Sequence, residues 1–397
     1  MHPRNLLYSI LLSAGFLACH KILPAVPAED QVLDGPVDGL SPAEQRRFLA
    51  GDKAFNDEIF TSSTGLGPLF VATSCGSCHA GDGKGHPFTS LTRFGQTDSS
   101  GNHFLDQGGP QLQNRALPGY TAEQLPAGAT HAVFTPPANT GLGYLDAVTD
   151  QTLLSLADPT DADGDGISGV PNWCSIPDYI ETRDETIERN GKYIGRFGKK
   201  AAAYDLLQQT VNAYNQDIGI TSSYAPRDTY TGLVTDAEVS EQTLNNVVFY
   251  LKTLKAPRQR NTNDAGVIAG RQVFSAIRCS DCHTPELKTG VSRIAVLSNK
   301  TIQPYTDLLL HDMGTGLDDG YTEGSALTSE WRTPALWGLG LSKNSQGGQY
   351  FLLHDGRAHS IEAAIDLHGG EAGDSRNRFQ QLEESQKKQL LKFLESL

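Results

Sequence analysis

The stretch TSCGSCHAGDGKGHPF, Thr73 to Phe88, contains two cysteines and a histidine in the order Cys-x-x-Cys-His. A second stretch, IRCSDCHTPEL, Ile277 to Leu287, repeats this five-residue core 204 residues later (279 − 75 = 204). Cys-x-x-Cys-His is the motif of covalent c-type haem attachment, in which two thiols bond to the porphyrin and the histidine ligates the iron. We therefore predict two haem c groups, attached at Cys75, Cys78 and His79 and at Cys279, Cys282 and His283.

The other roles of paired cysteines fit the sequence less well. A structural zinc site needs further ligand pairs at short spacing, and the chain has no third Cys-x-x-Cys pair. Three disulfides would use all six cysteines. However, Cys19 follows directly on the N-terminal apolar run, and four cysteines belong to the two motifs. Cys174 is then left alone, so we expect no disulfide framework.

The composition limits both the fold and the partners. The chain has 397 residues, of which 38% are hydrophobic, with 41 glycines and 20 prolines. Such a loop-rich chain has few side chains for two cores, and two large apolar porphyrins would supply the missing interior. The net charge is −14 and spread along the chain. This argues against a nucleic-acid partner, because neutralising the phosphate backbone requires clustered basic residues.

The N-terminus has the pattern of an export signal. Arg4 precedes the apolar run LLYSILLSAGFLA, which is too short to span a bilayer. We predict a signal peptide of the lipoprotein type over residues 1–19, with Cys19 as the lipid attachment site, and a linker over residues 20–40. Ordinary signal-peptidase cleavage is the alternative. Both place the protein in the periplasm or cell envelope, with membrane contact only through the lipid anchor at Cys19.

Repeated patterns indicate that the chain consists of two related halves. SPAEQRRFLAGDKAF (residues 41–55) and AGVIAGRQVFSAIR (residues 265–278) predict a helix before each motif, and the first opens with a capping box. NNVVFYLKTL (residues 245–254) and KQLLKFLESL (residues 388–397) predict a helix at the end of each half. The segments TPPANTGLGYLDA (residues 135–147) and TPALWGLGLSKN (residues 333–344) are a third correspondence. We predict a mainly α fold with two cytochrome c-like haem domains in tandem, residues 41–260 and 261–397, and long irregular loops.

At this point the sequence resembles the bacterial di-haem cytochrome c peroxidase superfamily. Within it the chain is similar to the di-haem oxidoreductase family, whose members also carry the name thiol oxidoreductase. The matching strings include GPLFVATSCGSCH, GLGYLDAV, DADGDGISG, GRFGKKA, DIGITS, LLLHDMGTGL, WRTPALWGLGL and LLHDGRAHSIEAAIDLHGGEA. The resemblance implies a redox enzyme. Thiol chemistry finds little support, because Cys174 has no partner cysteine.

The resemblance also suggests the second axial ligand of the C-terminal haem. In related peroxidases an HDG element is followed at a fixed interval by that ligand, and the same interval from His354 leads to His368. We therefore expect His283 and His368 to hold this iron, with Met313 as the alternative to His368. Two imidazoles without a methionine sulfur favour a low-potential, electron-storing haem.

The N-terminal haem has no such partner in the sequence. The register from Pro136 that would mirror His368 reaches Gly169, in a segment without histidine. His86, His103 and His131 remain as candidates. The resemblance favours His103 as a displaceable ligand, and an exposed loop histidine is the alternative. We expect the haem on His79 to be open, or easily opened, to an oxidant.

Peroxide chemistry also needs a group that moves a proton between the two oxygens. The resemblance nominates Asp146, where the family tends to have glutamate, together with Gln111 or Gln113. Trp331 and Trp337 are candidates for an aromatic group between the haems, although a tryptophan in a core is the common case.

The segment DADGDGISGVPN resembles a calcium-binding loop. Asp161, Asp163 and Asp165 occupy alternate positions before Gly166, but Asn172 stands where such loops place a bidentate glutamate. We expect calcium as a second type of cofactor here, with an Asp/Gly turn as the alternative.

Together these features predict an exported, peroxidase-like di-haem oxidoreductase. Its substrates would be a small oxidant such as hydrogen peroxide and an electron-donor protein, a small cytochrome or cupredoxin. Oxidation of an organic or protein substrate is a further possibility within this class. The alternative from another class is a di-haem electron carrier without substrate turnover.

Overall fold

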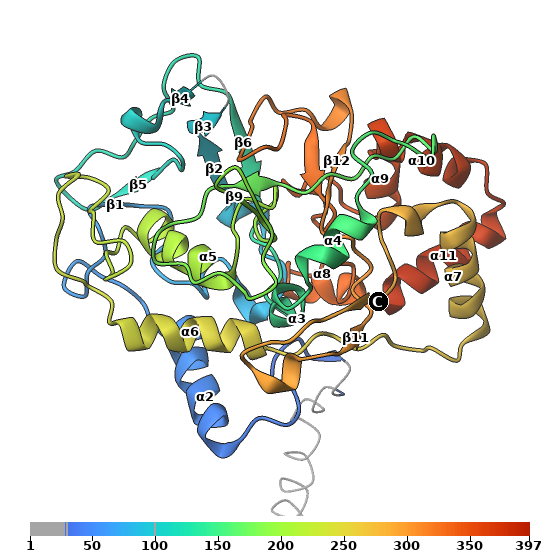
Figure 1. Cartoon of the computed structure of the whole chain (residues 1–397), viewed down its shortest axis with the longest axis horizontal. Coiled ribbons are helices and arrows are strands. Elements are labelled where there is room, and N and C mark those ends of the chain that lie inside the picture. Colours follow the sequence, from blue (N-terminus) through green and yellow to red (C-terminus); the bar gives the residue numbers. More distant parts are fainter. Residues whose placement is uncertain (1–27, 29–30, 99–100) are drawn as a thin grey trace, which may run out of the picture. The chain divides into compact units, whose positions relative to one another are not determined.

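Short helices joined by long irregular segments make up the computed structural model (Figure 1). The structure describes residue 28, residues 31–98 and residues 101–397, and for residues 96–98 and 101–103 it describes the backbone alone. All elements below belong to the compact unit Leu33–Leu397. These elements agree with the mainly α class predicted from the sequence, and the arrangement in two haem domains stays a prediction.

Two predictions for the N-terminus, the signal peptide and the lipid attachment at Cys19, are not tested by the described residues. The predicted signal peptide, including Cys19, lies outside them. Among the residues that the structure does describe, the helices are all too short or too polar to cross a bilayer.

The described residues contain ten α-helices, α2 to α11. Their bounds are α2 Pro42–Asn56, α3 Leu142–Asp146, α4 Asp150–Leu156, α5 Leu206–Asn212, α6 Glu241–Thr253, α7 Ala265–Ala276, α8 Ser342–Ser345, α9 Ile361–Asp366, α10 Gly373–Gln380 and α11 Glu384–Ser396. A π-helical turn, Ala213–Asp217, extends α5. The predicted capping box is present: the Glu44 backbone N–H donates to Ser41 Oγ at 3.3 Å, and the Ser41 N–H donates to Glu44 Oε2 at 2.8 Å.

The strands are two to four residues long and form only small antiparallel sheets. Four of these sheets join strands that are close in sequence: β3 (Gln96–Asp98) with β4 (Gly101–His103), β10 (Leu287–Lys288) with β11 (Thr301–Ile302), β12 (Leu310–Asp312) with β13 (Glu330–Arg332), and β7 (Trp173–Cys174) with β9 (Lys192–Ile194) and β8 (Glu188–Arg189). The other two pair β1 (Leu69–Phe70) with β5 (Arg115–Ala116) and β2 (Leu91–Phe94) with β6 (His131–Phe134). These ladders fix loops rather than forming a layer.

Two helix pairs repeat the same contact in the two halves of the chain. α2 packs against α6, and α7 packs against α11 (Figure 1). In each pair a glycine lets the backbones approach: a Cβ on Gly51 would lie 2.1 Å from the Asn246 carbonyl oxygen, and one on Gly270 would lie 2.0 Å from that of Gln389. The helices expected from the repeated sequence patterns therefore pack in the same way, which supports the internal duplication.

Two large hydrophobic clusters fill the unit. One surrounds α2, α5 and α6 and also takes in Leu287 and residues near Leu308. The other surrounds α7, α9 and α11, with Phe274 and Phe393 in contact at a ring separation of 5.4 Å. Residues 261–397 thus contribute to both clusters, and the division into domains at residue 260 stays a prediction.

Candidate functional site

The first Cys-x-x-Cys-His motif forms a tight turn after β1 that holds His79 in one orientation. The backbone N–H groups of Cys78 and His79 both donate to the Cys75 carbonyl, at 3.1 and 3.0 Å. The His79 Nδ1 lies 3.0 Å from the Pro137 carbonyl oxygen. Because a carbonyl only accepts, Nδ1 carries the proton and Nε2 keeps a free lone pair. The ring of Phe55, from α2, lies 5.9 Å from the His79 ring.

The second motif has the same geometry at the end of α7. The His283 N–H donates to the Cys279 carbonyl at 3.0 Å, and His283 Nδ1 donates to the Tyr305 carbonyl at 3.0 Å. Phe274, from α7, lies 6.4 Å from the His283 ring, as Phe55 does in the first motif. Both histidines therefore present Nε2 as a ligand atom. The hydrogen bond from Nδ1 to a backbone carbonyl fixes the orientation of each ring, as is usual for histidines that bind metals.

The four motif cysteines are free of disulfide bonds, as is Cys174. Among the described residues the disulfide alternative is therefore not realised. Burial raises the pKa of Cys174 to about 12, so its thiol stays protonated and unreactive. This agrees with the expectation that thiol chemistry is not its role.

His368 lies just beyond the C-terminal end of α9 and near His283. Its Nδ1 donates to the Ala364 carbonyl at 2.7 Å, so Nε2 is again the free nitrogen. Burial, together with the charges of His368 and His311, lowers the pKa of His283 to about 4, so both of these imidazoles are electrostatic neighbours of His283. Met313 instead packs in a small hydrophobic cluster with Trp331. His368 therefore has a free Nε2 and lies within electrostatic range of His283, and its role as the second ligand stays a prediction.

Gln111 belongs to a buried polar cluster that includes a residue the sequence did not suggest. Its Nε2 donates to the carboxylate of Asp217, the last residue of the π-helical turn. Burial raises the pKa of Asp217 to about 6, and the charge of Asp217 in turn raises the pKa values of Cys75 and Cys78. Gln113 lies next to this cluster, with its Nε2 3.1 Å from the Gln216 carbonyl oxygen. Gln111 and Asp217 are therefore near the first motif.

Asp146 has the contacts of a structural carboxylate. It ends the short helix α3, and its oxygens lie 3.0 Å from Arg183 Nη2 and 2.9 Å from Lys252 Nζ. Burial alone would raise the pKa of Asp146, but Lys252 and Arg183 outweigh burial and lower it to about 2. An acid–base group must give up and regain a proton near the working pH, and these contacts do not favour that. The role of Asp146 stays a prediction that its surroundings support poorly.

The remaining histidine candidates are placed unequally. His103 is part of β4, but its side chain lies outside the described residues. The His86 ring lies 4.5 Å from the Phe88 ring, and His86 Nδ1 accepts from the Phe88 N–H at 3.1 Å. His131 is exposed on β6. None of these positions decides the sixth ligand of the first site.

The two tryptophans differ in burial and contacts. Trp331 is buried and stacks on the His354 ring at 3.7 Å with an interplanar angle of 6°. Its indole N–H donates to the Leu317 carbonyl at 2.8 Å. Trp337 is only partly buried and packs on the larger hydrophobic cluster. Of the two, Trp331 is the more rigidly held, and an electron-transfer role for either stays a prediction.

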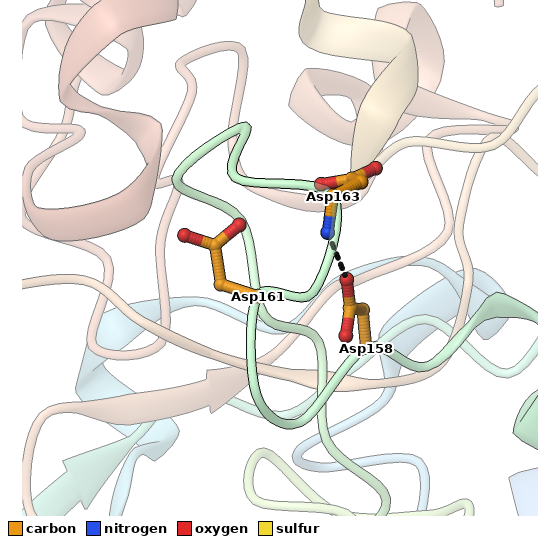
Figure 2. A group of neighbouring side chains, drawn as sticks. All are labelled: Asp158, Asp161 and Asp163. Atoms are coloured by element: carbon orange, nitrogen blue, oxygen red, sulfur yellow. Dashed lines mark hydrogen bonds between the residues drawn. The ribbon is translucent and has the colours of Figure 1, made fainter.

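The Asp/Gly loop brings three carboxylates together, and one of them was not expected. Ligand oxygens of Asp158, Asp161 and Asp163 lie within 4.8 Å of one another (Figure 2). The Asp163 N–H also donates to Asp158 Oδ2 at 3.3 Å. Asp165, which the sequence included, forms an ion pair with Arg278 instead. The spacing of Asp158, three residues before Asp161, was the signal available in the sequence.

A charged cluster beside the second motif was not foreseen from the sequence. His311 is buried, with Nε2 2.8 Å from Asp307 Oδ2 and Nδ1 2.7 Å from Glu371 Oε2. Burial opposes its charge, but hydrogen bonds with Asp307, Cys282 and Glu371 raise the pKa of His311 to about 12. Glu371 also accepts from Ser168 Oγ at 2.6 Å. Nothing in the local pattern around His311 indicates that these distant residues meet.

Comparison with known proteins adds the family. The profile of the family described as "Di-haem oxidoreductase, putative peroxidase" matches residues 132–397, a span of 266 residues (397 − 131) in a chain of 397. The second Cys-x-x-Cys-His motif is inside this span, and the first lies before it. No curated protein sequence matches the chain significantly. Among solved structures, the chain is similar to one of hydrazine synthase from Kuenenia stuttgartiensis pressurised with xenon, at 14% identity and a TM-score of 0.42, over 95% of this chain and 98% of that one. The profile match covers more than half of the sequence, and the chain therefore belongs to the di-haem oxidoreductase family.

Proposed function

We propose that this chain is an exported c-type di-haem peroxidase with two unlike haem sites. The observation that carries the proposal is the repeated motif geometry combined with one asymmetry. His79 and His283 each present Nε2 from a backbone-anchored ring beside two free cysteines. Among the described histidines, His368 and His311 are electrostatic neighbours of His283, and His79 has none. Of the two, His368 keeps Nε2 free, whereas both nitrogens of His311 are held by Asp307 and Glu371. One site would be closed on both sides, and the other would be open to an oxidant.

The residues present fit haem c at both positions. Each motif supplies two thiols for thioether bonds and one neutral imidazole, and an aromatic ring from the preceding helix lies near that imidazole. When bound, the haem at the first site supplies an iron that binds and reduces peroxide, and the haem at the second supplies a stored electron. The chain itself fixes ring orientation through the carbonyls of Pro137 and Tyr305.

The Gln111–Asp217 pair is the proton-handling group that this proposal favours. Gln111 Nε2 donates to the Asp217 carboxylate, which leaves the other carboxylate oxygen able to hold a proton. Burial raises the pKa of Asp217 to about 6, so the carboxyl can exchange a proton near neutral pH. Asp146, the group nominated from the sequence, is held between two cations, whereas Asp217 borders Cys75 and Cys78.

The remaining expectations form part of the same proposal. Hydrogen peroxide is the oxidant, and a small cytochrome or cupredoxin is the donor, for which the net charge of −14 favours a basic partner. The protein acts in the periplasm or cell envelope, anchored through Cys19. The alternative is an electron carrier, which would need both irons to be six-coordinate.

Calcium is proposed as a structural cofactor of the loop in Figure 2. The oxygens of Asp158, Asp161 and Asp163 are ligands of the type that calcium prefers. Calcium binding to the folded state would raise the melting temperature, and chelation would lower it. Asp161→Asn should remove this calcium dependence, whereas Asp184→Asn, an exposed acid in another loop, should keep it. If the wild-type melting temperature does not change when calcium is added or chelated, the calcium site is refuted.

The proposal is tested by counting haems and open irons in the full-length holoprotein. We expect two haems per chain in a pyridine haemochrome assay and one in either the Cys75→Ala/Cys78→Ala or the Cys279→Ala/Cys282→Ala variant. Cys174→Ala is the matched control and should keep two. Cyanide should then bind one equivalent per chain, and the Cys75→Ala/Cys78→Ala variant should bind none. Fewer than two haems would refute the cofactor assignment. Two haems without cyanide binding in any redox state would establish the electron carrier.

A further inference from the structure

Three basic side chains, Lys84, Lys199 and Arg332, are largely buried and have no acidic partner among the described residues. Lys84 Nζ donates to the Leu353 carbonyl at 3.2 Å, and Lys199 Nζ lies 3.5 Å from Thr135 Oγ1. Arg332 donates only to backbone carbonyls, at 3.0 and 3.2 Å. In the part of the chain that the structure describes, none of the three forms an ion pair within 4.0 Å of a carboxylate oxygen.

Burial destabilises the charged forms of these three side chains. Burial lowers the pKa of Lys84 to about 7, that of Arg332 to about 10 and that of Lys199 well below its ordinary value. Repulsion from Lys84 and Arg332 lowers the pKa of Lys199 further, so the three charges gather in one region. An enclosed charge without a counter-ion costs several kcal/mol. A protein that retains three such cations together normally has an anion among them.

Acidic side chains are not in short supply. The chain has 46 acidic and 32 basic residues, and other buried cations do have acidic partners, such as Arg196 with Asp150. The charge of Asp355 acts to raise the pKa of both Lys84 and Lys199, but this carboxylate is already paired with Arg357 at 2.6 Å. The missing anion is therefore not a side chain described in this region.

The cluster lies around the first haem motif. Lys84 follows His79 by five residues. Thr135, which contacts Lys199, is two residues before Pro137, whose carbonyl orients the His79 ring. The charge of Lys199 also lowers the pKa of His79. Arg332 joins the cluster through β13, because its N–H donates to the Lys199 carbonyl at 3.0 Å.

We infer that Lys84, Lys199 and Arg332 bind the two propionate carboxylates of the haem attached at His79. This inference rests on the proposed haem site. Haem c carries the anions that the cluster lacks, namely two propionate carboxylates on one edge of an apolar ring. The ammonium and guanidinium groups would form charge-assisted hydrogen bonds with them. Positive charge held at the propionates favours the reduced haem, so the cluster raises the potential of the open site relative to its bis-histidine partner.

The test uses full-length holoprotein with Lys199→Met and Lys84→Met, read by spectroelectrochemistry. Thioether attachment does not involve either lysine, so both variants should retain two haems per chain. Loss of one charge-assisted hydrogen bond should lower the reduction equilibrium constant of the cyanide-binding haem about tenfold, which is 59 mV for a one-electron couple. The propionate-bending band in the resonance Raman spectrum should shift as well. Lys199→Arg should restore both readouts, because it restores a cationic donor.

Lys200 is a matched control on the same turn. Its Nζ donates to three carbonyls, those of Leu327, Thr328 and Glu330, at 2.8 to 3.1 Å. It also lies over the Trp331 ring at 3.8 Å. Lys200→Met should lower the melting temperature but leave the potential and the propionate band near those of the wild type.

The outcomes separate this inference from the proposed function. A wild-type protein with fewer than two haems would overturn the proposed function itself. Two haems with unchanged potential and propionate band in both Lys199→Met and Lys84→Met would overturn the inference alone. Equal shifts in Lys199→Met and Lys200→Met would also overturn it, because they would reflect general loss of charge rather than contact with the propionates.

Discussion

At the scale of single residues, His368 decides how the two haem sites differ. Its Nε2 is free because Nδ1 donates to the Ala364 carbonyl. If it ligates the iron opposite His283, His368→Ala should convert that haem from low spin to high spin in the visible and EPR spectra. His368→Met should keep low spin and raise the potential, because a methionine sulfur favours the reduced iron.

His359 provides the matched control for that prediction, because it is exposed and nine residues earlier in the same segment. Its replacement by alanine should leave all spectra unchanged. If His368→Ala keeps the wild-type low-spin signal, the interval counted from His354 has led to the wrong residue.

We expect Asp146 to contribute to the stability of the folded protein rather than to turnover. Its folded-state pKa is depressed to about 2, by Lys252 and Arg183 acting against burial. A depressed carboxyl pKa stabilises the folded protein above the unfolded value near 3.8, and this contribution is lost as the pH falls through about 2. Asp146→Asn leaves two buried cations with one partner fewer. We expect it to lower the free energy of unfolding by about 3 kcal/mol at pH 7 and to unfold with a weaker pH dependence below pH 4.

Denaturant unfolding at several pH values would measure this. Turnover per folded, haem-loaded molecule should change little in Asp146→Asn, whereas Asp217→Asn should reduce it without a comparable loss of stability. If Asp146→Asn keeps wild-type stability but loses turnover, the acid–base role suggested by the family resemblance is the correct one.

The residues that sequence analysis located are those with a local pattern. The Cys-x-x-Cys-His motifs, the capping box at Ser41 and the Asp/Gly loop all depend on residues within a few positions of one another. Asp217 and Glu371 were missed because their partners, Gln111 and His311, are 106 and 60 residues away. No spacing rule identifies such pairs in a single sequence.

At the scale of elements, the helix pairs depend on one glycine each. A Cβ on Gly270 would lie 2.0 Å from the Gln389 carbonyl oxygen and 2.7 Å from Phe393 Cβ, so α7 and α11 would have to separate. Gly270→Ala should lower the free energy of unfolding by about 1–3 kcal/mol, despite the better helix propensity of alanine. Gly266→Ala, one turn earlier on α7, would meet only side-chain atoms, Lys392 Cδ at 3.0 Å and Asp264 Oδ1 at 3.1 Å, so its effect should be clearly smaller than that of Gly270→Ala. Equal effects of the two substitutions in thermal unfolding would contradict this packing.

Helices were predictable and strands were not, for a physical reason. The four helices around the two motifs have apolar stripes at helical spacing, and each buries that stripe against one partner. The strands are two to four residues long, so the alternation of apolar and polar residues that marks a strand has no room to develop. Such short ladders follow from tertiary contacts rather than from local propensity.

At the scale of the whole molecule, some of the contacts between the two halves of the chain are buried and charged. Arg93 Nη2, on β2, lies 2.6 Å from Glu323 Oε1, and both side chains are more than four-fifths buried. Glu371 also connects the two halves, because it accepts a hydrogen bond from Ser168 Oγ at 2.6 Å. The sequence repeat predicts a boundary at residue 260 because its first copy ends there. Ionic contacts such as these leave no periodic trace, which is why the sequence does not show how the halves are joined.

These contacts predict that residues 33–397 unfold as one cooperative unit. Glu323→Gln would leave Arg93 buried without its carboxylate, and breaking one partner of a buried pair costs about 3–5 kcal/mol. In calorimetry of the holoprotein we expect one transition, shifted as a whole to lower temperature. Glu181→Gln is the matched control, because its pair with Arg293 also joins the two halves but is more than three-quarters exposed on both sides. Exposed pairs contribute about 0–1 kcal/mol, so this variant should melt almost as the wild type does. Two transitions in the wild type, or a Glu323→Gln effect confined to one of them, would show instead that the halves are independent domains whose boundary the sequence repeat had placed correctly.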